Sequence, residues 1–206
     1  MKKAVFLFAI AAFLFAGNAQ AQLGINIGYA PQTTTTVSGN STSSSEMPGF
    51  FVGANYNKAL SENGIGISFG VQARYNTKTE TNSLLSVTTT TKNTQFLIDI
   101  PVLLNFGLNL GSDARLAFFA GPTFSYALSG NTNVTENVLN TSTDYPWYGD
   151  NSNSSQFDLM GTFGASLDYK TFRLFGGYRL GLLDLDKRDN VKSTTSGIFV
   201  GVGFLM

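Results

Sequence analysis

The chain has no histidine and no cysteine, and only 13% of its 206 residues are charged, about half the roughly 25% of an ordinary soluble domain. The first two absences exclude a zinc site built on Cys or His, a disulfide scaffold, a catalytic thiol and an imidazole acid or base. Basic and acidic residues are balanced at 13 each, so the chain lacks the excess positive charge typical of proteins that bind nucleic acid. We therefore expect no nucleic-acid partner, and no motif indicates a cofactor.

The first 21 residues have the pattern of an export signal. Two lysines precede an uncharged apolar run over 4–17, and Ala19-Gln20-Ala21 supplies the small-x-small pattern that signal peptidase recognises. This run of about 14 residues is shorter than the roughly 20 that a spanning helix needs, which disfavours the alternative of a membrane anchor. The prediction is a signal peptide over 1–21, cleaved after Ala21, and one domain over 22–206 that is exported through the periplasm.

After residue 22, no apolar run approaches the roughly 18 residues that indicate a transmembrane helix. Apolar side chains instead alternate with small or polar ones, as in 95–108, where Phe96, Ile98 and Ile100 begin a row on one face. Because successive side chains of a strand point to opposite faces, each such segment predicts a β-strand with one apolar side. Eight segments show the pattern: 22–30, 48–59, 64–76, 94–108, 114–128, 156–169, 172–184 and 195–206.

The connections between these segments are alternately short and long. Short turns lie at 61–63, 109–113 and 170–171, and long polar segments at 31–47, 77–93, 129–155 and 185–194. Outer-membrane barrels have this asymmetry, with short periplasmic turns and long external loops. An even number of strands closes the sheet without a free edge. The sequence therefore predicts an all-β fold, an eight-stranded antiparallel up-and-down transmembrane β-barrel, surrounded by the lipid of the cell outer membrane.

The two faces of the strands decide between a membrane barrel and a soluble, lipocalin-like periplasmic barrel that holds a ligand inside. The face opposite the large apolar side chains is rich in glycine, which suits the narrow interior of an eight-stranded barrel and would be a poor surface toward water. The large apolar face carries almost no charge and has aromatic residues near both ends, as at the two interfaces of a bilayer. We favour the membrane barrel and keep the soluble barrel as a distant alternative.

Seven charged residues fall on the small-residue face and are expected to point into the barrel: Arg74, Asp99, Arg115, Asp158, Asp168, Arg173 and Arg179. Eight strands leave no aqueous channel, and unpaired buried charge is strongly unfavourable. We interpret the seven as a network that pairs inside a plugged lumen, with Asp99, Asp158 and Arg179 at its centre. An ion path or a small-ligand site is the alternative interpretation.

The longest polar segment, 129–155, contains the only tryptophan, in Asp144-Tyr-Pro-Trp-Tyr-Gly149. Loops on a rigid scaffold are common binding sites, so Tyr145, Trp147 and Tyr148 are candidates for contact with a ligand, a glycan or a partner. Trp147 as an anchor at the barrel rim is the alternative. The runs Thr33–Thr36 and Thr88–Thr91 favour extended, solvated hairpins over glycan attachment sites. The aspartates of the long segments are too scattered to predict a calcium site.

Four stretches in the second half carry a recognisable likeness: 96–105 (FLIDIPVLLN), 120–124 (AGPTF), 157–167 and 173–185 (RLFGGYRLGLLDL). They resemble the outer-membrane β-barrel (PorT-like) proteins of the Bacteroidetes. The resemblance implies a small eight-stranded barrel, inserted by the barrel assembly machinery and in many members without a defined activity. One member type assists a secretion system, although no motif here carries that role. Such barrels usually end on an aromatic residue that the machinery reads, whereas this chain ends Phe204-Leu205-Met206.

The sequence shows no catalytic constellation. The lipases, acyltransferases and surface proteases built on small barrels use an imidazole, which this chain lacks, and its Ser, Asp and Lys residues show no matching spacing. The leading hypothesis is therefore a non-enzymatic surface protein, a structural scaffold whose outer loops contact or bind a partner. The alternative is a transport or secretion-accessory component of the outer membrane that works with an unidentified surface or secretion partner.

Overall fold

The computed structural model describes residues 21–61, 64–84, 87–136, 141–149 and 152–206. The predicted export signal lies outside these residues except for Ala21, which opens the first strand. Within the described ranges, no helix is long and apolar enough to cross a membrane. Eleven strands form there: β1 (Ala21–Tyr29), β2 (Gln32–Ser38), β3 (Ser41–Met47), β4 (Gly49–Ala59), β5 (Ile65–Leu84), β6 (Val87–Asn109), β7 (Ala114–Glu136), β8 (Thr141–Pro146), β9 (Phe157–Tyr169), β10 (Phe172–Gly181) and β11 (Val191–Leu205).

Eight of the strands form a closed antiparallel ring. The order of pairing is β1, β4, β5, β6, β7, β9, β10 and β11, and β11 pairs back to β1. Ile27 of β1, for example, lies opposite Val52 of β4 on one side and Val202 of β11 on the other. The ring therefore has no free edge, which confirms the predicted eight-stranded antiparallel barrel.

The side chains of the ring point as the alternating pattern predicted. Large apolar residues such as Ile27, Phe163 and Ile198 are more than half exposed on the outer wall. Aromatic pairs stand at both ends of this wall, with Tyr29 against Phe50 at one end and Phe172 against Phe204 at the other. An apolar wall with aromatic ends is what a lipid bilayer requires of a barrel.

The sequence suggested an interior lined mainly by small residues, but the interior also contains large aromatic side chains. Phenylalanines at 51, 119, 175 and 199 also point inward and pack together. Each ring lies on a glycine of a neighbouring strand: a Cβ placed on Gly28, Gly164, Gly201 or Gly177 would lie 2.6–2.8 Å from the corresponding ring. The glycines of the inner face thus make room for a layer of aromatic rings inside the lumen.

One end of the barrel, called the outer end here, carries the long connections. The sequence predicts long polar loops here, but most of these connections are strands. β2 and β3 form a hairpin, β5 continues to Leu84, β6 begins at Val87, and β7 continues to Glu136 and pairs with β8. Both threonine runs lie in these strands, which confirms the extended hairpins. β-Branched threonine suits strands, and the barrel supplies the ladders on which they continue.

Two prolines interrupt the first half of the wall at the outer end. Pro31 separates β1 from β2 and Pro48 separates β3 from β4, because proline has no N–H to donate to the ladder. The carbonyl oxygens of Ala30 and Met47 instead accept hydrogen bonds from Asn76 Nδ2, at 3.3 and 3.2 Å. Asn76 is fully buried, so it holds the β2–β3 hairpin to the barrel.

Replacing Asn76 with leucine should lower the free energy of unfolding by about 1–3 kcal/mol, because buried carbonyl oxygens lose their donor. Urea unfolding of the refolded barrel in detergent, followed by gel mobility, measures the change. Asn82→Leu on the exposed outer part of the same strand is the control and should shift the midpoint little. Equal midpoints for the two variants would contradict the role assigned to Asn76.

Candidate functional site

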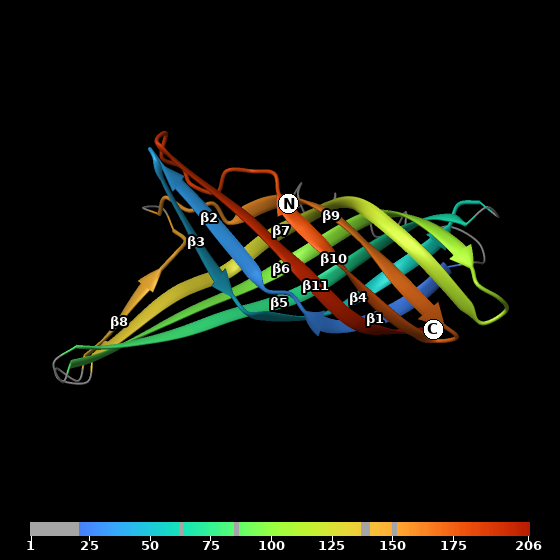
Figure 1. The fold of residues 1–206 in the computed structure, drawn as a ribbon, viewed down its shortest axis with the longest axis horizontal. Helices are drawn as coiled ribbons and strands as arrows, with labels where there is room; N and C mark the ends of the chain where they lie inside the picture. The colour runs from blue at the N-terminus through green and yellow to red at the C-terminus, as the bar shows by residue number, and fades with distance from the viewer. Residues whose placement is uncertain (1–20, 62–63, 85–86, 137–140, 150–151) are drawn as a thin grey trace, which may run out of the picture.

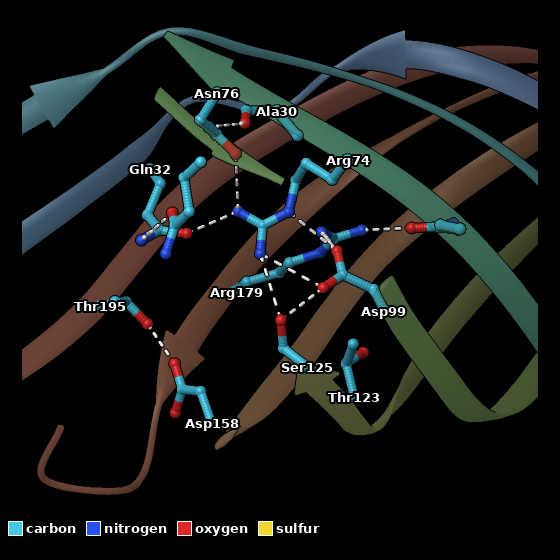
Figure 2. Close-up of polar contacts among 12 residues, drawn as sticks. Ala30, Gln32, Arg74, Asn76, Asp99, Thr123, Ser125, Asp158, Arg179 and Thr195 are labelled. Atoms are coloured by element: carbon cyan, nitrogen blue, oxygen red, sulfur yellow. Dashed lines mark hydrogen bonds and ion pairs between the residues drawn. The ribbon is translucent and has the colours of Figure 1, made fainter. Parts of the chain in front are cut away.

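A buried cluster of three charged residues crosses the middle of the lumen (Figure 2). Asp99 of β6 accepts hydrogen bonds from Arg74 Nε at 2.8 Å, Arg74 NH2 at 3.3 Å and Arg179 NH1 at 3.0 Å. Ser125 adds a fourth bond to Asp99 at 2.6 Å. Asp99 is 0% exposed. Because Arg179 comes from β10 and its partners from β5 and β6, the cluster joins separated parts of the ring.

Further contacts hold Arg179 in place. Its NH2 donates to Gln72 Oε1 at 2.7 Å, and its guanidinium carbon lies 4.8 Å from the Phe199 ring centroid. Cation–π contacts of this kind strengthen where water is excluded. The charge cluster and the aromatic layer therefore close the lumen together.

A chain of amide hydrogen bonds runs from the cluster toward the outer end. Arg74 NH1 donates to Gln32 Oε1 at 2.7 Å, and Gln32 Nε2 donates to Gln95 Oε1 at 3.4 Å. Gln95 Nε2 in turn donates to the Tyr148 hydroxyl oxygen at 2.6 Å. The outer segment that contains Tyr148 is thus tied to the buried charges of the barrel.

The other four predicted lumen charges do not join this cluster. Arg173 makes a separate two-bond pair with Asp168 at 2.6 and 2.8 Å, because the two residues lie directly opposite each other on β10 and β9 near the short turns. Arg115 donates to the Gly64 carbonyl oxygen at 3.3 Å. Asp158 accepts from Thr195, and its Oδ1 has no partner among the described residues. The structure thus brings together Arg74, Asp99 and Arg179, and leaves Asp158 outside the centre predicted for it.

Two cavities lie on opposite sides of the charge cluster. The inner cavity, about 140 Å³, is lined by Arg179 and Gln72 and extends toward Gln22 and Lys58 near the short turns. The outer cavity, about 280 Å³, has Gln32 and Gln95 in its lining. The cluster therefore separates a cavity at the short-turn end from one at the outer end.

We call the outer cavity the vestibule. Residues from all four long connections line it: Thr34 and Ser45 from the first, Lys78 and Asn93 from the second, Trp147, Tyr148 and Ser155 from the third, and Asp186 and Ser193 from the fourth. Buried Gln32, Gln95 and Thr195 also belong to the lining, together with Met47, Ser154 and Leu185. Four segments that are distant in the sequence therefore build one concave site.

A β-bulge explains how the aromatic part of the vestibule forms. The register between β6 and β7 shifts at Phe96/Leu97, so Gly130 lies opposite Gln95 and is buried. A Cβ on Gly130 would lie 2.7 Å from ring atoms of both Trp147 and Tyr148. Trp147 Nε1 also donates to Thr132 Oγ1 at 2.7 Å. An extra residue in one strand reverses which side chains face inward, and here it creates the surface on which the two rings pack.

The three predicted contact residues have different positions. Trp147 and Tyr148 line the vestibule, with ring centroids 6.5 Å apart in an edge-to-face arrangement. Tyr145 is 55% exposed on β8 and is not part of the lining. Burial raises the pKa of the Tyr148 hydroxyl above its usual value. Like an ordinary tyrosine hydroxyl, this group is protonated at neutral pH.

The sequence pattern did not single out the buried amides. Gln32, Gln95 and Asn76 connect the barrel to the outer hairpins, yet each stood in or beside a segment assigned as polar loop. Their position next to predicted strand ends was the available signal. Within the described ranges, no group of three or more acidic residues could hold a metal ion. Asp144 is instead hydrogen-bonded to Asn131 and Asn133, and Asp186 pairs with Arg188.

Comparison with known proteins identifies the architecture. A family model described as outer membrane protein beta-barrel domain matches residues 15–187. No curated protein matches the sequence. Similar solved structures include Ail of Yersinia pestis in complex with the heparin analogue sucrose octasulfate, at 15% identity and a TM-score of 0.45, covering 90% of this chain and 100% of Ail.

Two neisserial structures are similar to the same degree. Neisserial surface protein A is 14% identical with a TM-score of 0.41, and 87% of this chain and 96% of that protein are covered. The translocator domain of the autotransporter NalP from Neisseria meningitidis is 10% identical with a TM-score of 0.44, at 98% and 94% coverage. With TM-scores below 0.5, these likenesses carry no functional argument.

Replacing Asp99 with asparagine should lower the free energy of unfolding by about 3–5 kcal/mol, because it leaves two buried guanidinium groups without an anion. Urea unfolding in detergent measures this loss. Asp113→Asn, in an exposed short turn, is the matched control and should have little effect. Adding Arg179→Met to Asp99→Asn should restore part of the stability. Equal stability of the wild type and Asp99→Asn would contradict the proposed role of the cluster.

Proposed function

This chain belongs to the family of outer membrane protein beta-barrel domains, and from that premise we propose that it is a non-enzymatic surface scaffold whose outer connections bind material outside the cell. Membership in this family places the apolar wall in outer-membrane lipid. The long connections then face the exterior, since barrels of this class keep their short turns in the periplasm. The observation that carries the proposal is that all four outer connections line one vestibule above a blocked lumen.

The lumen argues against a channel as the main function. Asp99 and its two arginine partners cross it, and Arg179 lies over the rings of Phe51 and Phe199, two of the four inward phenylalanines. An eight-stranded barrel has an interior just wide enough for side chains. A solute crossing this barrel would have to displace a buried ion-pair cluster, which is strongly unfavourable.

The outer connections have the rigidity that a binding surface needs. Their strands continue the barrel ladders, as in the pairing of Lys78 with Asn93 between β5 and β6. The amide chain from Arg74 to Tyr148 adds side-chain ties from the barrel. Groups fixed before binding lose less conformational entropy when a partner arrives, which favours recognition at this end.

We extend the proposal to three finer features of the chain. The first is a PorT-like identity within the Bacteroidetes, supported by 96–105 and 173–185. The second is export by a signal peptide cleaved after Ala21, which leaves 22–206 as the mature barrel. The third is insertion by the barrel assembly machinery, with Phe204 on the lipid face as the terminal aromatic residue that it reads.

A secretion-accessory role is the second candidate, and the inner cavity favours it. This cavity lies at the short-turn end and includes Lys58, Arg115 and Arg173 among polar amides. Such a surface could receive an acidic segment of a periplasmic partner. Cross-linking from a photoreactive residue at Lys58 tests it: a specific protein adduct in cells supports this role, and its absence favours the surface scaffold.

Replacing 129–155 with an Asn-Gly turn should leave a folded barrel that no longer binds outside the cell, because it removes the aromatic side of the vestibule. Retention of nanodisc-embedded protein on immobilised mucin, polysaccharide and matrix protein measures the binding. The control removes 81–90 of the β5–β6 hairpin and leaves the vestibule residues Lys78 and Asn93, and the Lys78 partner Glu80, in place. Unchanged retention after loss of 129–155 would refute the surface-scaffold proposal.

A further inference from the structure

We propose that the vestibule binds a neutral saccharide, taking the end of a glycan chain between the aromatic pair and the amide floor. This inference rests on the proposed surface function and names its ligand class. The vestibule has a volume of about 280 Å³ and is lined by side chains of all four outer connections. A concave site with a few converging polar groups and aromatic rings is the usual form of a small-molecule site.

The hydrogen-bonding groups of the vestibule match a polyhydroxylated ligand. Amides are present at Gln32, Asn93 and Gln95, and hydroxyl groups come from Thr34, Ser193 and other small residues of the lining. Side-chain amides and hydroxyls each offer both donors and acceptors. Sugar hydroxyls also donate and accept, so such a lining can pair with several of them at once.

The charges of the vestibule favour a neutral ligand over an ionic one. Lys78 pairs with Glu80 at 2.8 Å, and Asp186 pairs with Arg188 at 2.6 Å. The two charged residues of the lining thus have opposite signs, and each has its own counter-ion. Recognition of a sulfated or phosphorylated ligand uses clustered arginine or lysine, and the lining has one lysine and no arginine.

The aromatic pair supplies the apolar part of sugar recognition. One face of a sugar ring is formed by C–H groups, which pack on aromatic rings, while the hydroxyls lie at its edge. Trp147 and Tyr148 are held at the vestibule by Gly130, Thr132 and Gln95. Because these rings are already fixed, binding orders few side chains.

The vestibule is closed at its floor and open on one side. Gln32 and Gln95 close the floor, because both are hydrogen-bonded below the ligand space and Gln32 is bonded to Arg74. Within the described residues, β3 pairs with β2 and not with β5, and the β2–β3 hairpin diverges from the hairpins built on β5 to β8 (Figure 1). A chain end can therefore enter while the rest of the polymer leaves between the hairpins.

The test uses the only tryptophan of the sequence, which lies in the site. The refolded mature barrel is titrated with maltotriose, cellotriose and chitotriose while Trp147 emission is recorded. At least one should give a saturable change. Tyr148→Ala should weaken binding at least tenfold, and Tyr145→Ala, the matched control outside the vestibule, should leave it within about twofold.

A second variant keeps the test valid if Tyr148→Ala fails to fold, which loss of heat-dependent gel mobility would reveal. Asn93→Leu removes an amide from the wall and should also weaken binding at least tenfold. The same binding assay separates two sources of the glycan. Competition by lipopolysaccharide sugar chains indicates a lipid-linked glycan of the same membrane, and a lack of competition indicates a glycan from outside the cell.

Three results would overturn the inference. No response of Trp147 to any neutral sugar would do so, as would equal binding by Tyr148→Ala and the wild type. Sucrose octasulfate is titrated in the same way as an anionic comparison, and a response to it alone would replace the neutral class with an anionic one. In each case, loss of surface retention after removal of 129–155 would still support the surface scaffold, so the two proposals fail separately.

Discussion

The placement of Asp99 between Arg74 and Arg179 is the interaction on which the rest of the structure depends. A carboxylate that is fully buried in a barrel needs partners, and here they come from both sides of the lumen. The same bonds close the barrel interior, orient Gln32 for the vestibule floor and hold Arg179 against the aromatic layer. One electrostatic requirement therefore places a buried ion-pair cluster across the lumen and fixes the amide floor of the vestibule.

Local irregularities of the strands form the concave site at the outer end of the barrel. Threonine-rich strands continue the wall, prolines at 31 and 48 bend one hairpin away, and a bulge in β7 turns Gly130 inward. Each device is local, but together they bring four connections around one vestibule. The same two prolines create the lateral opening between β3 and β5. Because the β2–β3 hairpin bends away from the barrel wall, β3 forms no ladder with β5.

The fold was largely predictable from the sequence and the site only in part. Alternation of side chains gave eight strands and the correct outward face, because a bilayer and a narrow lumen impose opposite chemistry on the two faces. The pairing of Arg74 and Arg179 with one aspartate could not be predicted from the sequence. It depends on strand register and on the position of each residue along the barrel axis, which decide which inward charges form ion pairs. For the same reason Asp158, predicted to be central, bonds to Thr195 instead. The alternation places the four interior phenylalanines on the inner face, but only the structure shows that each ring lies on a glycine of a neighbouring strand.

The central claim is that the Asp99 cluster and the aromatic layer close the lumen. Its most direct test is the conductance of the refolded barrel in a planar bilayer. The account predicts no stable single-channel steps for the wild type. A variant with Arg74→Ser, Asp99→Ser and Arg179→Ser removes the cluster but keeps the inward phenylalanines, so it measures how much of the closure the cluster supplies. Steady ohmic steps from the wild-type barrel would contradict the account.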